Sequence, residues 1–256
     1  FDLNFAEDLK YVIQQFKAEG ITDLILDLRF NNGGSVELAR YLAASIAGTS
    51  HRSDVFMRMQ RNSGADEYIR FGDGDDLNLK SVRIICSEET ASASELIISG
   101  LRGIDFPVKL FGSRTEGKNV GMEVQEYKYG NKYYEFAPIT FRSFNAKDWG
   151  DYADGIDPDV MLNNQNSSYE DDIDNVFPYA FGDWDNFDFN YPLYWALCDV
   201  QGVDPTTGEP VKRSGRAGLT RSSKDEIIRV PSVPLKRPAG TFGSLIYNKP
   251  EVENLY

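Results

Sequence analysis

The sequence predicts an α/β fold in which helices cover a mainly parallel sheet. Short, continuous apolar runs such as "ITDLILDLRF" and "SVRIIC" alternate with segments of helical periodicity. Polar turns rich in glycine or serine, "NNGG" and "TASASE", lie where a strand pattern gives way to a helix pattern. Strands of a parallel sheet are usually buried on both faces, and right-handed crossovers through helices connect them.

The first elements can be assigned from their end signals. Residues 4–20 have helical periodicity, Asn4 and Glu7 resemble a capping box, and Gly20 is a natural stop. The run at 21–30 is predicted to be a parallel strand buried on both faces. After "NNGG", Ser35 is expected to cap a second helix. The apolar face of that helix carries Leu38, Leu42 and Ile46.

Further along the chain, "DVFMRM", "SVRIIC", a helix from Ser92 to about Leu101, and "PVKLFGS" continue the alternation. The stretch 120–144 alternates around "YGN", which predicts a β-hairpin added to the sheet. "DGIDPDV" closes this part of the chain. We therefore expect a core domain at 1–165.

Residues 166–256 differ in composition and are predicted to be a C-terminal extension packed on the core. An acidic, aromatic segment comes first, then a helix at about Leu193–Val200, then a Pro-, Gly- and Lys/Arg-rich tail. Alternating acids and aromatics suggest that the rings pack on the core and the acids face water. The rings are Phe177, Phe181, Trp184, Phe187 and Trp195, and the acids are Asp183, Asp185 and Asp188.

Composition excludes several classes of function. A net charge of −13 disfavours nucleic acid and anionic membranes as partners. The chain holds two cysteines and one histidine, His51, which argues against a zinc site or a disulfide framework. No apolar run reaches the roughly 20 residues that span a bilayer. No metal or organic cofactor is expected.

Three segments offer groups for catalysis, and each has an ordinary structural alternative. The amides of Gly33 and Gly34 can bind an oxyanion or simply form a tight turn; no Lys-Ser/Thr pair follows to make a phosphate loop. Ser92 stands where a strand gives way to a helix, as a nucleophile or as a cap with Glu95. Lys118 is either solvated or a general base for Ser92.

"LILDLRFNNGGS", "TASASE" and "TEGKN", in this order, resemble the signature segments of the C-terminal processing (tail-specific) serine peptidases, and "DGIDPDV" resembles the end of their core. The resemblance covers about residues 5–160. It implies that Ser92 is the nucleophile and Lys118 the general base. It implies an oxyanion hole from Gly33 or Gly34 with Ala93, and supporting positions at Glu95 and Thr115. It also implies a core of β-β-α units similar to the crotonase and Clp-protease fold.

The same resemblance implies protein or peptide substrates, an exported protein (periplasmic, or membrane-anchored on the outer side), and a PDZ-like domain upstream of Phe1. Many members have glutamine four residues after the lysine, where this chain has Met122. An inactive peptide-binding protein of the same fold is therefore an alternative. A crotonase-like acyl-CoA enzyme is another, because it would also use backbone amides as an oxyanion hole.

Thr90, Ser92 and Ser94 compete for the role of nucleophile within "TASASE". Ser92 is favoured because it is predicted to lie at the strand-to-helix junction, with the Ala93 amide next to it. Ser94 would lie inside the first turn, where its hydroxyl can bond locally. Thr90 lies before the turn, and its branched side chain fits a close substrate approach less well.

Overall fold

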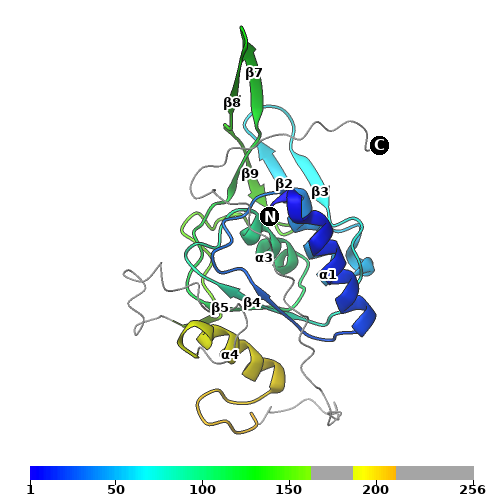
Figure 1. The fold of residues 1–256 in the computed structure, drawn as a ribbon, viewed down its shortest axis with the longest axis vertical. Helices are drawn as coiled ribbons and strands as arrows, with labels where there is room; N and C mark the ends of the chain where they lie inside the picture. Colours follow the sequence, from blue (N-terminus) through cyan, green and yellow to red (C-terminus); the bar gives the residue numbers. More distant parts are fainter. Residues whose placement is uncertain (163–186, 212–256) are drawn as a thin grey trace. The chain divides into compact units, whose positions relative to one another are not determined.

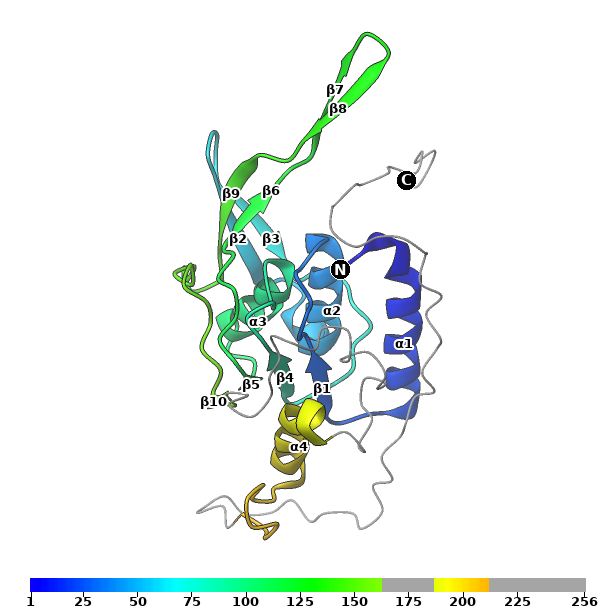
Figure 2. The same cartoon turned by 60° about the vertical axis from the view of Figure 1, so that its left-hand side comes forward.

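The computed structural model describes residues 1–162 and 187–211 (Figures 1 and 2). A first unit of the chain spans Phe1–Lys212. The described residues all lie in the first unit, which has a mixed α/β fold. They contain a parallel sheet, an antiparallel sheet and a separate hairpin.

The parallel sheet confirms the predicted strand–helix alternation. Its strand order is β1-β4-β5-β10. β1, the first strand in this order, pairs with β4 alone among the described strands. It is therefore less buried than the sequence predicts: Leu24 is buried, but Asp27 is exposed. The four strands are β1 (Leu24–Asp27), β4 (Val82–Cys86), β5 (Val108–Gly112) and β10 (Val160–Met161).

The antiparallel sheet corrects one expectation. The run "DVFMRM" forms β2, which does not extend the parallel sheet but pairs antiparallel with β3 and β9. The connection 62–66 between β2 and β3 is too short for a parallel crossover, so the two strands must run antiparallel. The strand order is β3-β2-β9-β6. The strands are β2 (Val55–Arg61), β3 (Glu67–Arg70), β6 (Val120–Met122) and β9 (Ile139–Phe144).

The predicted hairpin is present, but it is not part of either large sheet. β7 (Gln125–Tyr129) and β8 (Lys132–Phe136) pair only with each other among the described strands. Gly130 has a φ of 62° at the first position of the two-residue loop, where glycine is favoured. The hairpin projects beyond β6 and β9 (Figure 2). No other element of the described residues packs against the exposed side chains of the hairpin, so the hairpin stays separate from the sheet.

The first helix, α1 (Ala6–Glu19), ends at Gly20 as predicted, with a left-handed φ of 64°. The predicted capping box of Asn4 and Glu7 is wrong. Asp2 instead accepts a hydrogen bond from the Asn4 N–H, which begins a short 3-10 helix, η1 (Leu3–Phe5), and shifts the start of α1 to Ala6.

Two helices form the core between the sheets. Ser35 caps α2 (Val36–Ala47) by accepting a hydrogen bond from the Leu38 N–H, as predicted. α3 (Ala93–Gly103) packs against α2, β2 and β5. Both views show α3 between β2–β9 and β4–β5 (Figures 1 and 2). The buried cluster includes Ile46, Phe56, Val82, Ile84, Ile97, Ile98, Leu101 and Phe141.

Within the predicted C-terminal extension, α4 (Phe187–Gln201) is longer than expected and includes Pro192. It packs against β1, β4 and β5; Trp195 is half-buried and Ala196 is fully buried. Phe177, Phe181, Trp184, Asp183 and Asp185 lie outside the described residues, as do the side chains of Phe187 and Asp188. The boundary near residue 165 stays a prediction.

Asp199 attaches α4 to the parallel sheet. Its carboxylate accepts hydrogen bonds from Arg83 on β4 and Lys109 on β5. Arg83 also pairs with Asp23, just before β1. Burial opposes ionisation of Asp199, but the hydrogen bonds from Lys109 and Arg83 hold its pKa below the ordinary value. The ion pairs of Asp199 with Arg83 and Lys109 therefore contribute to stability only while Asp199 is ionised.

We expect Asp199→Asn to lower the free energy of unfolding by about 1–2 kcal/mol at pH 7, because two charge-assisted hydrogen bonds weaken. The folded-state pKa of Asp199 lies below the unfolded value of about 3.9. The advantage of the parent over the variant should therefore persist above pH 4 and shrink as the pH falls through the lowered pKa. Urea unfolding of both proteins at several pH values measures this, and equal stability at pH 7 would contradict it.

Candidate active site

The site lies at the carboxyl edge of the parallel sheet, where open α/β sheets usually bind ligands. Three loops meet there: the glycine turn after β1, the turn between β4 and α3, and the loop after β5. The Ala91 N–H donates to the Asn31 carbonyl at 3.2 Å, and the Glu116 N–H donates to the Thr90 carbonyl at 3.0 Å. The turn before α3 is thus bonded to both of its neighbours.

Glu95 is the centre of this arrangement. Its side chain is fully buried and accepts four hydrogen bonds. The donors are the Ser92 N–H at 2.9 Å, the Thr115 hydroxyl at 2.5 Å, the Gly117 N–H at 2.8 Å and the Lys118 N–H at 2.9 Å. Burial raises the pKa of Glu95, while the hydrogen bonds favour its charged form. One carboxylate therefore joins the Ser92 turn to the Lys118 loop.

Thr115 extends this connection to the segment that closes the core. While its hydroxyl donates to Glu95, it also accepts a hydrogen bond from the Ile156 N–H at 2.8 Å. The Thr115 N–H in turn donates to the Ile156 carbonyl. The "DGIDPDV" segment is therefore fixed to the same carboxylate through one buried hydroxyl.

Ser92 has an unusual backbone conformation for a residue with a side chain, with φ 56° and ψ −115°. Such a conformation costs of order 1–3 kcal/mol and is concentrated at functional sites. A strained turn from strand to helix is also how a nucleophile elbow exposes its serine. Ser92 immediately precedes α3, and its N–H makes the Glu95 bond of a capping box. The predicted cap with Glu95 is therefore present, and the role of Ser92 as a nucleophile stays a prediction.

The other two hydroxyls of the segment are fully buried and hydrogen bonded. Thr90 donates to the Leu28 carbonyl at 2.8 Å. Ser94 donates to Asn31, whose carbonyl oxygen lies at 2.8 Å and side-chain oxygen at 3.0 Å. Ser92 is half-buried. Of the three candidates, Ser92 alone is partly exposed to solvent.

Lys118 lies close to Ser92 in the backbone. Their N–H groups donate to the same oxygen of Glu95, so the two nitrogens are at most two hydrogen-bond lengths apart. The Lys118 side chain is half-buried, and its amine pairs with no carboxylate of the described residues. Gly117 must be glycine here, because its φ is 100° and a Cβ would lie 2.4 Å from the Ala153 carbonyl oxygen.

The two predicted oxyanion-hole glycines differ in position. Gly33 contacts the Ser92 turn directly, since a Cβ there would lie 2.8 Å from both the Ala93 nitrogen and Ser92 Cβ. Its N–H donates to Asn31 Oδ1 at 3.1 Å. The Gly34 N–H donates to no group within residues 1–162 and 187–211. As the first residue of α3, Ala93 has an N–H without an intrahelical partner.

Asn31 was not among the predicted site residues. It accepts hydrogen bonds from Ala91, Ser94 and Gly33, so it fixes the glycine turn against the Ser92 turn. An open groove of about 650 Å³ lies beside it, lined in part by Asn31, Asn32 and Gly33. The sequence signal was only that asparagine is common in turns.

Other candidate groups lie elsewhere or are inert. His51 is at the end of η2 (Thr49–His51), where its Nδ1 lies 2.7 Å from Asp54. Burial raises the pKa of the Cys86 thiol to about 12, as expected for an unreactive core cysteine. In the described part of the chain, no three His, Cys, Asp or Glu side chains cluster as a metal site requires. No described helix combines the length and apolarity needed to cross a bilayer.

We expect Glu95→Gln to destabilise the fold, because an amide nitrogen would face donors that now contact a carboxylate oxygen. With one or two donors left unsatisfied, the loss should be about 2–4 kcal/mol in the free energy of unfolding. Urea unfolding measures it. Glu116→Gln is the matched control, since Glu116 is exposed on the same loop and should change little. Equal stabilities for both variants would show that the Glu95 bonds do not hold the loops.

Comparison with known proteins shows the family to which the chain belongs. A "probable CtpA-like serine protease" of Staphylococcus haemolyticus is 26% identical over 165 residues, which is 63% of this chain and 32% of that protein. Its counterpart in Staphylococcus aureus is 25% identical over 72% of this chain and 36% of its own length. The chain therefore spans about a third of the length of these curated relatives.

Two solved structures have a similar fold. A putative S41 protease from Bacteroides fragilis aligns with a TM-score of 0.64 and 24% identity, over 78% of this chain and 50% of that one. A photosystem II D1 C-terminal processing protease aligns with a TM-score of 0.51 and 22% identity, over 64% of this chain and 40% of that one. The sequence profile described as peptidase family S41 matches residues 1–162. The chain therefore belongs to peptidase family S41.

Proposed function

We propose that the chain is the catalytic core of a serine endopeptidase in which Ser92 and Lys118 form a dyad. The observation that carries this proposal is the shared contact with Glu95. A strained serine at the start of a helix and a lysine that follows a glycine donate their backbone N–H groups to one oxygen atom. Membership of family S41 supports a serine-type peptidase. The assignment of Ser92 and Lys118 as its dyad is our own proposal.

In the proposed mechanism, Ser92 Oγ attacks the carbonyl carbon of the scissile bond while the neutral Lys118 amine takes its proton. Lys118 then gives that proton to the leaving amine, which leaves an acyl-enzyme on Ser92. Water, with its proton removed by Lys118, hydrolyses the ester and restores Ser92. No metal or organic cofactor takes part in these steps.

The proposed oxyanion hole consists of the Ala93 N–H and one glycine N–H. Gly33 is the nearer glycine, and its N–H must exchange Asn31 Oδ1 for the oxyanion when it serves as the donor. Gly34 is the other candidate, with an N–H that no described group accepts. Ser94 remains as a donor to Asn31 after such an exchange.

The substrates we propose are proteins or peptides, in line with the "CtpA-like serine protease" names of the relatives. An exported location and an upstream PDZ-like domain are parts of this proposal that rest on resemblance alone. The relation of the core to the crotonase and Clp-protease fold also rests on resemblance alone. The succession of β3, β4 and α3 is compatible with a β-β-α unit.

One observation favours a second candidate, a peptide-binding protein without activity. Met122, at the position where many members carry glutamine, lies on β6 with 41% of its side chain exposed, and it cannot accept or donate as an amide would. The acyl-CoA enzyme remains a weaker alternative, since an oxyanion hole alone gives no reason for the strain at Ser92.

We expect Ser92→Ala and Lys118→Ala each to lower kcat for a fluorogenic peptide by at least about 10³-fold, because the two residues act as one unit. The double variant should be no worse than either single one. Ser92→Ala should cost at most about 0.5–2 kcal/mol of stability, as for the loss of a helix cap. Lys147→Ala is the matched control, because it removes the positive charge of an exposed lysine elsewhere on the chain, and it should retain activity.

An active Ser92→Ala protein together with an inactive Ser94→Ala protein would show that the nucleophile is misassigned. An inert parent that still binds peptides would favour the second candidate. Both measurements use the full-length protein.

A further inference from the structure

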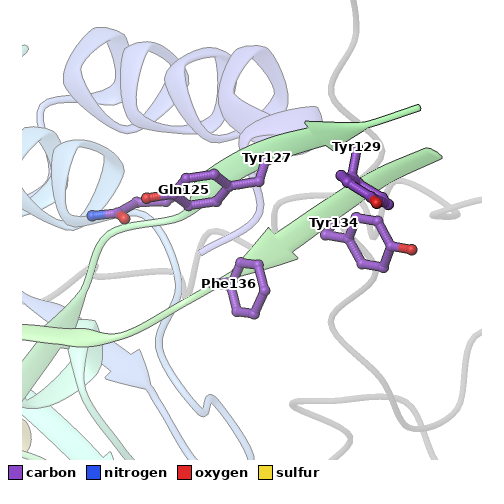
Figure 3. A pocket seen from close by; sticks show the side chains of 5 residues that line it. All are labelled: Gln125, Tyr127, Tyr129, Tyr134 and Phe136. Carbon is purple, nitrogen blue, oxygen red and sulfur yellow. The ribbon is translucent and has the colours of Figure 1, made fainter. Parts of the chain in front are cut away.

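The β7–β8 hairpin has one face on which four of the six residues are aromatic, the other two being Gln125 and Lys132. Tyr127 lies opposite Tyr134 and Gln125 opposite Phe136 in the strand register, so these residues share a face with Tyr129. Figure 3 shows the five side chains around an open hollow of about 490 Å³. Tyr127 and Phe136 meet edge to face, with ring centroids 5.8 Å apart. We refer to these five residues as the aromatic face.

The rings of the aromatic face are largely exposed: Tyr129 by 80%, Tyr127 by 59%, Phe136 by 55% and Tyr134 by 44%. The opposite face is different. It pairs Glu126 with Glu135, and the Lys128 amine lies 5.2 Å from the Tyr133 ring centre. A hairpin of two strands has little stability of its own, and the described residues supply no cover for the rings. The aromatic face therefore has the properties of a binding surface.

We propose that the aromatic face binds an extended, apolar segment of the substrate protein at a distance from the bond that Ser92 cleaves. This inference rests on the proposed function, because the ligand is a substrate of the same chain. Tyrosine suits such binding, since its ring supplies a large apolar area at a low cost in conformational entropy and its hydroxyl accepts or donates a hydrogen bond.

The area of the aromatic face argues for a peptide segment over a second copy of this chain. Covering four partly exposed rings buries roughly 500 Å² on this side. A stable interface between folded proteins needs about 800 Å² from each partner. Patches of about 300–600 Å² are the size commonly found at functional sites of monomers.

The net charge of the chain also argues against a second copy as the ligand. Two copies of a chain with a net charge of −13 repel each other. The hairpin itself is balanced, with Glu126 and Glu135 against Lys128 and Lys132. It is thus a locally neutral, apolar surface on an acidic protein, which suits an uncharged segment of an unfolded chain.

The backbone of the hairpin favours an extended ligand. Among the described strands, β7 and β8 pair only with each other, so each has an edge with free N–H and C=O groups. An extended segment can join such an edge as a third strand, with alternate side chains directed onto one face. Alternate side chains of a segment that joins β7 or β8 can then contact the aromatic face.

The hairpin is also continuous with the candidate active site. Lys118 is separated from β6 by Asn119 alone, and β7 follows β6 after two residues. Both views show the hairpin projecting beyond β9, and Figure 2 shows it projecting beyond β6 as well (Figures 1 and 2). The proposal requires that a long unfolded substrate contact the hairpin and Ser92 together, and that a short peptide bound at Ser92 not extend to the hairpin.

The test compares a long substrate with a short one. We expect Tyr127→Thr/Tyr134→Thr, which keeps β-forming residues in both strands, to raise KM for reduced, carbamidomethylated lactalbumin about tenfold with kcat unchanged. Its kcat and KM for a six-residue fluorogenic peptide should match those of the parent. Tyr133→Thr is the matched control: Tyr133 is 60% exposed on the opposite face and should leave both substrates unaffected.

Binding provides a readout that does not depend on activity. The affinity of the Ser92→Ala protein for fluorescently labelled, carbamidomethylated lactalbumin, measured by anisotropy, should fall about tenfold when the Tyr127→Thr/Tyr134→Thr changes are added. If the parent protein has no peptidase activity, the same loss of affinity would support the binding surface even though the proposed function fails. Unchanged affinity and KM would overturn the inference. A dimer in sedimentation that only the hairpin variant loses would also overturn it, since a second copy would then be the occupant.

Discussion

The candidate site depends on a buried carboxylate with four hydrogen-bond donors around it. Glu95 has no contact with water, and an ionised group in such a place is tolerated only when its oxygens are satisfied. The donors come from the Ser92 turn and from the loop that carries Thr115, Gly117 and Lys118. Two segments more than twenty residues apart in the sequence are thereby held at one point, and the geometry of the proposed dyad follows from it.

The Glu95 hydrogen bonds and the close packing of the turns sustain the backbone strain at Ser92. Its positive φ is unfavourable for any residue with a Cβ. Gly33 and Gly117 allow the neighbouring loops to approach closely, since a Cβ at either position would meet backbone atoms at less than 3 Å. The same closeness brings the Gly33 amide near that of Ala93. Strain, glycine packing and a candidate oxyanion hole are therefore consequences of one arrangement.

Most features with local causes were predicted correctly from the sequence, although the capping box of Asn4 and Glu7 was not. Ser35 caps its helix, Gly20 ends the preceding one, and the apolar runs 82–86 and 108–112 each form a strand. Several features that depend on contacts between segments distant in the sequence were not predicted. β2 belongs to a second sheet because β9 lies beside it, and the β7–β8 hairpin stays separate because no other strand reaches it. Asn31 was missed for the same reason, since its role depends on Ser94 in another loop.

The central claim is that Ser92 becomes acylated during turnover. The most direct measurement is to mix the protein with an activated peptide ester, stop the reaction with acid, and locate the added mass by peptide mapping. The account predicts one acyl group per chain, on the peptide that contains Ser92, and no adduct in a Lys118→Ala protein under the same conditions. An adduct on Thr90, Ser94 or a residue elsewhere, formed while the ester is turned over, would contradict it.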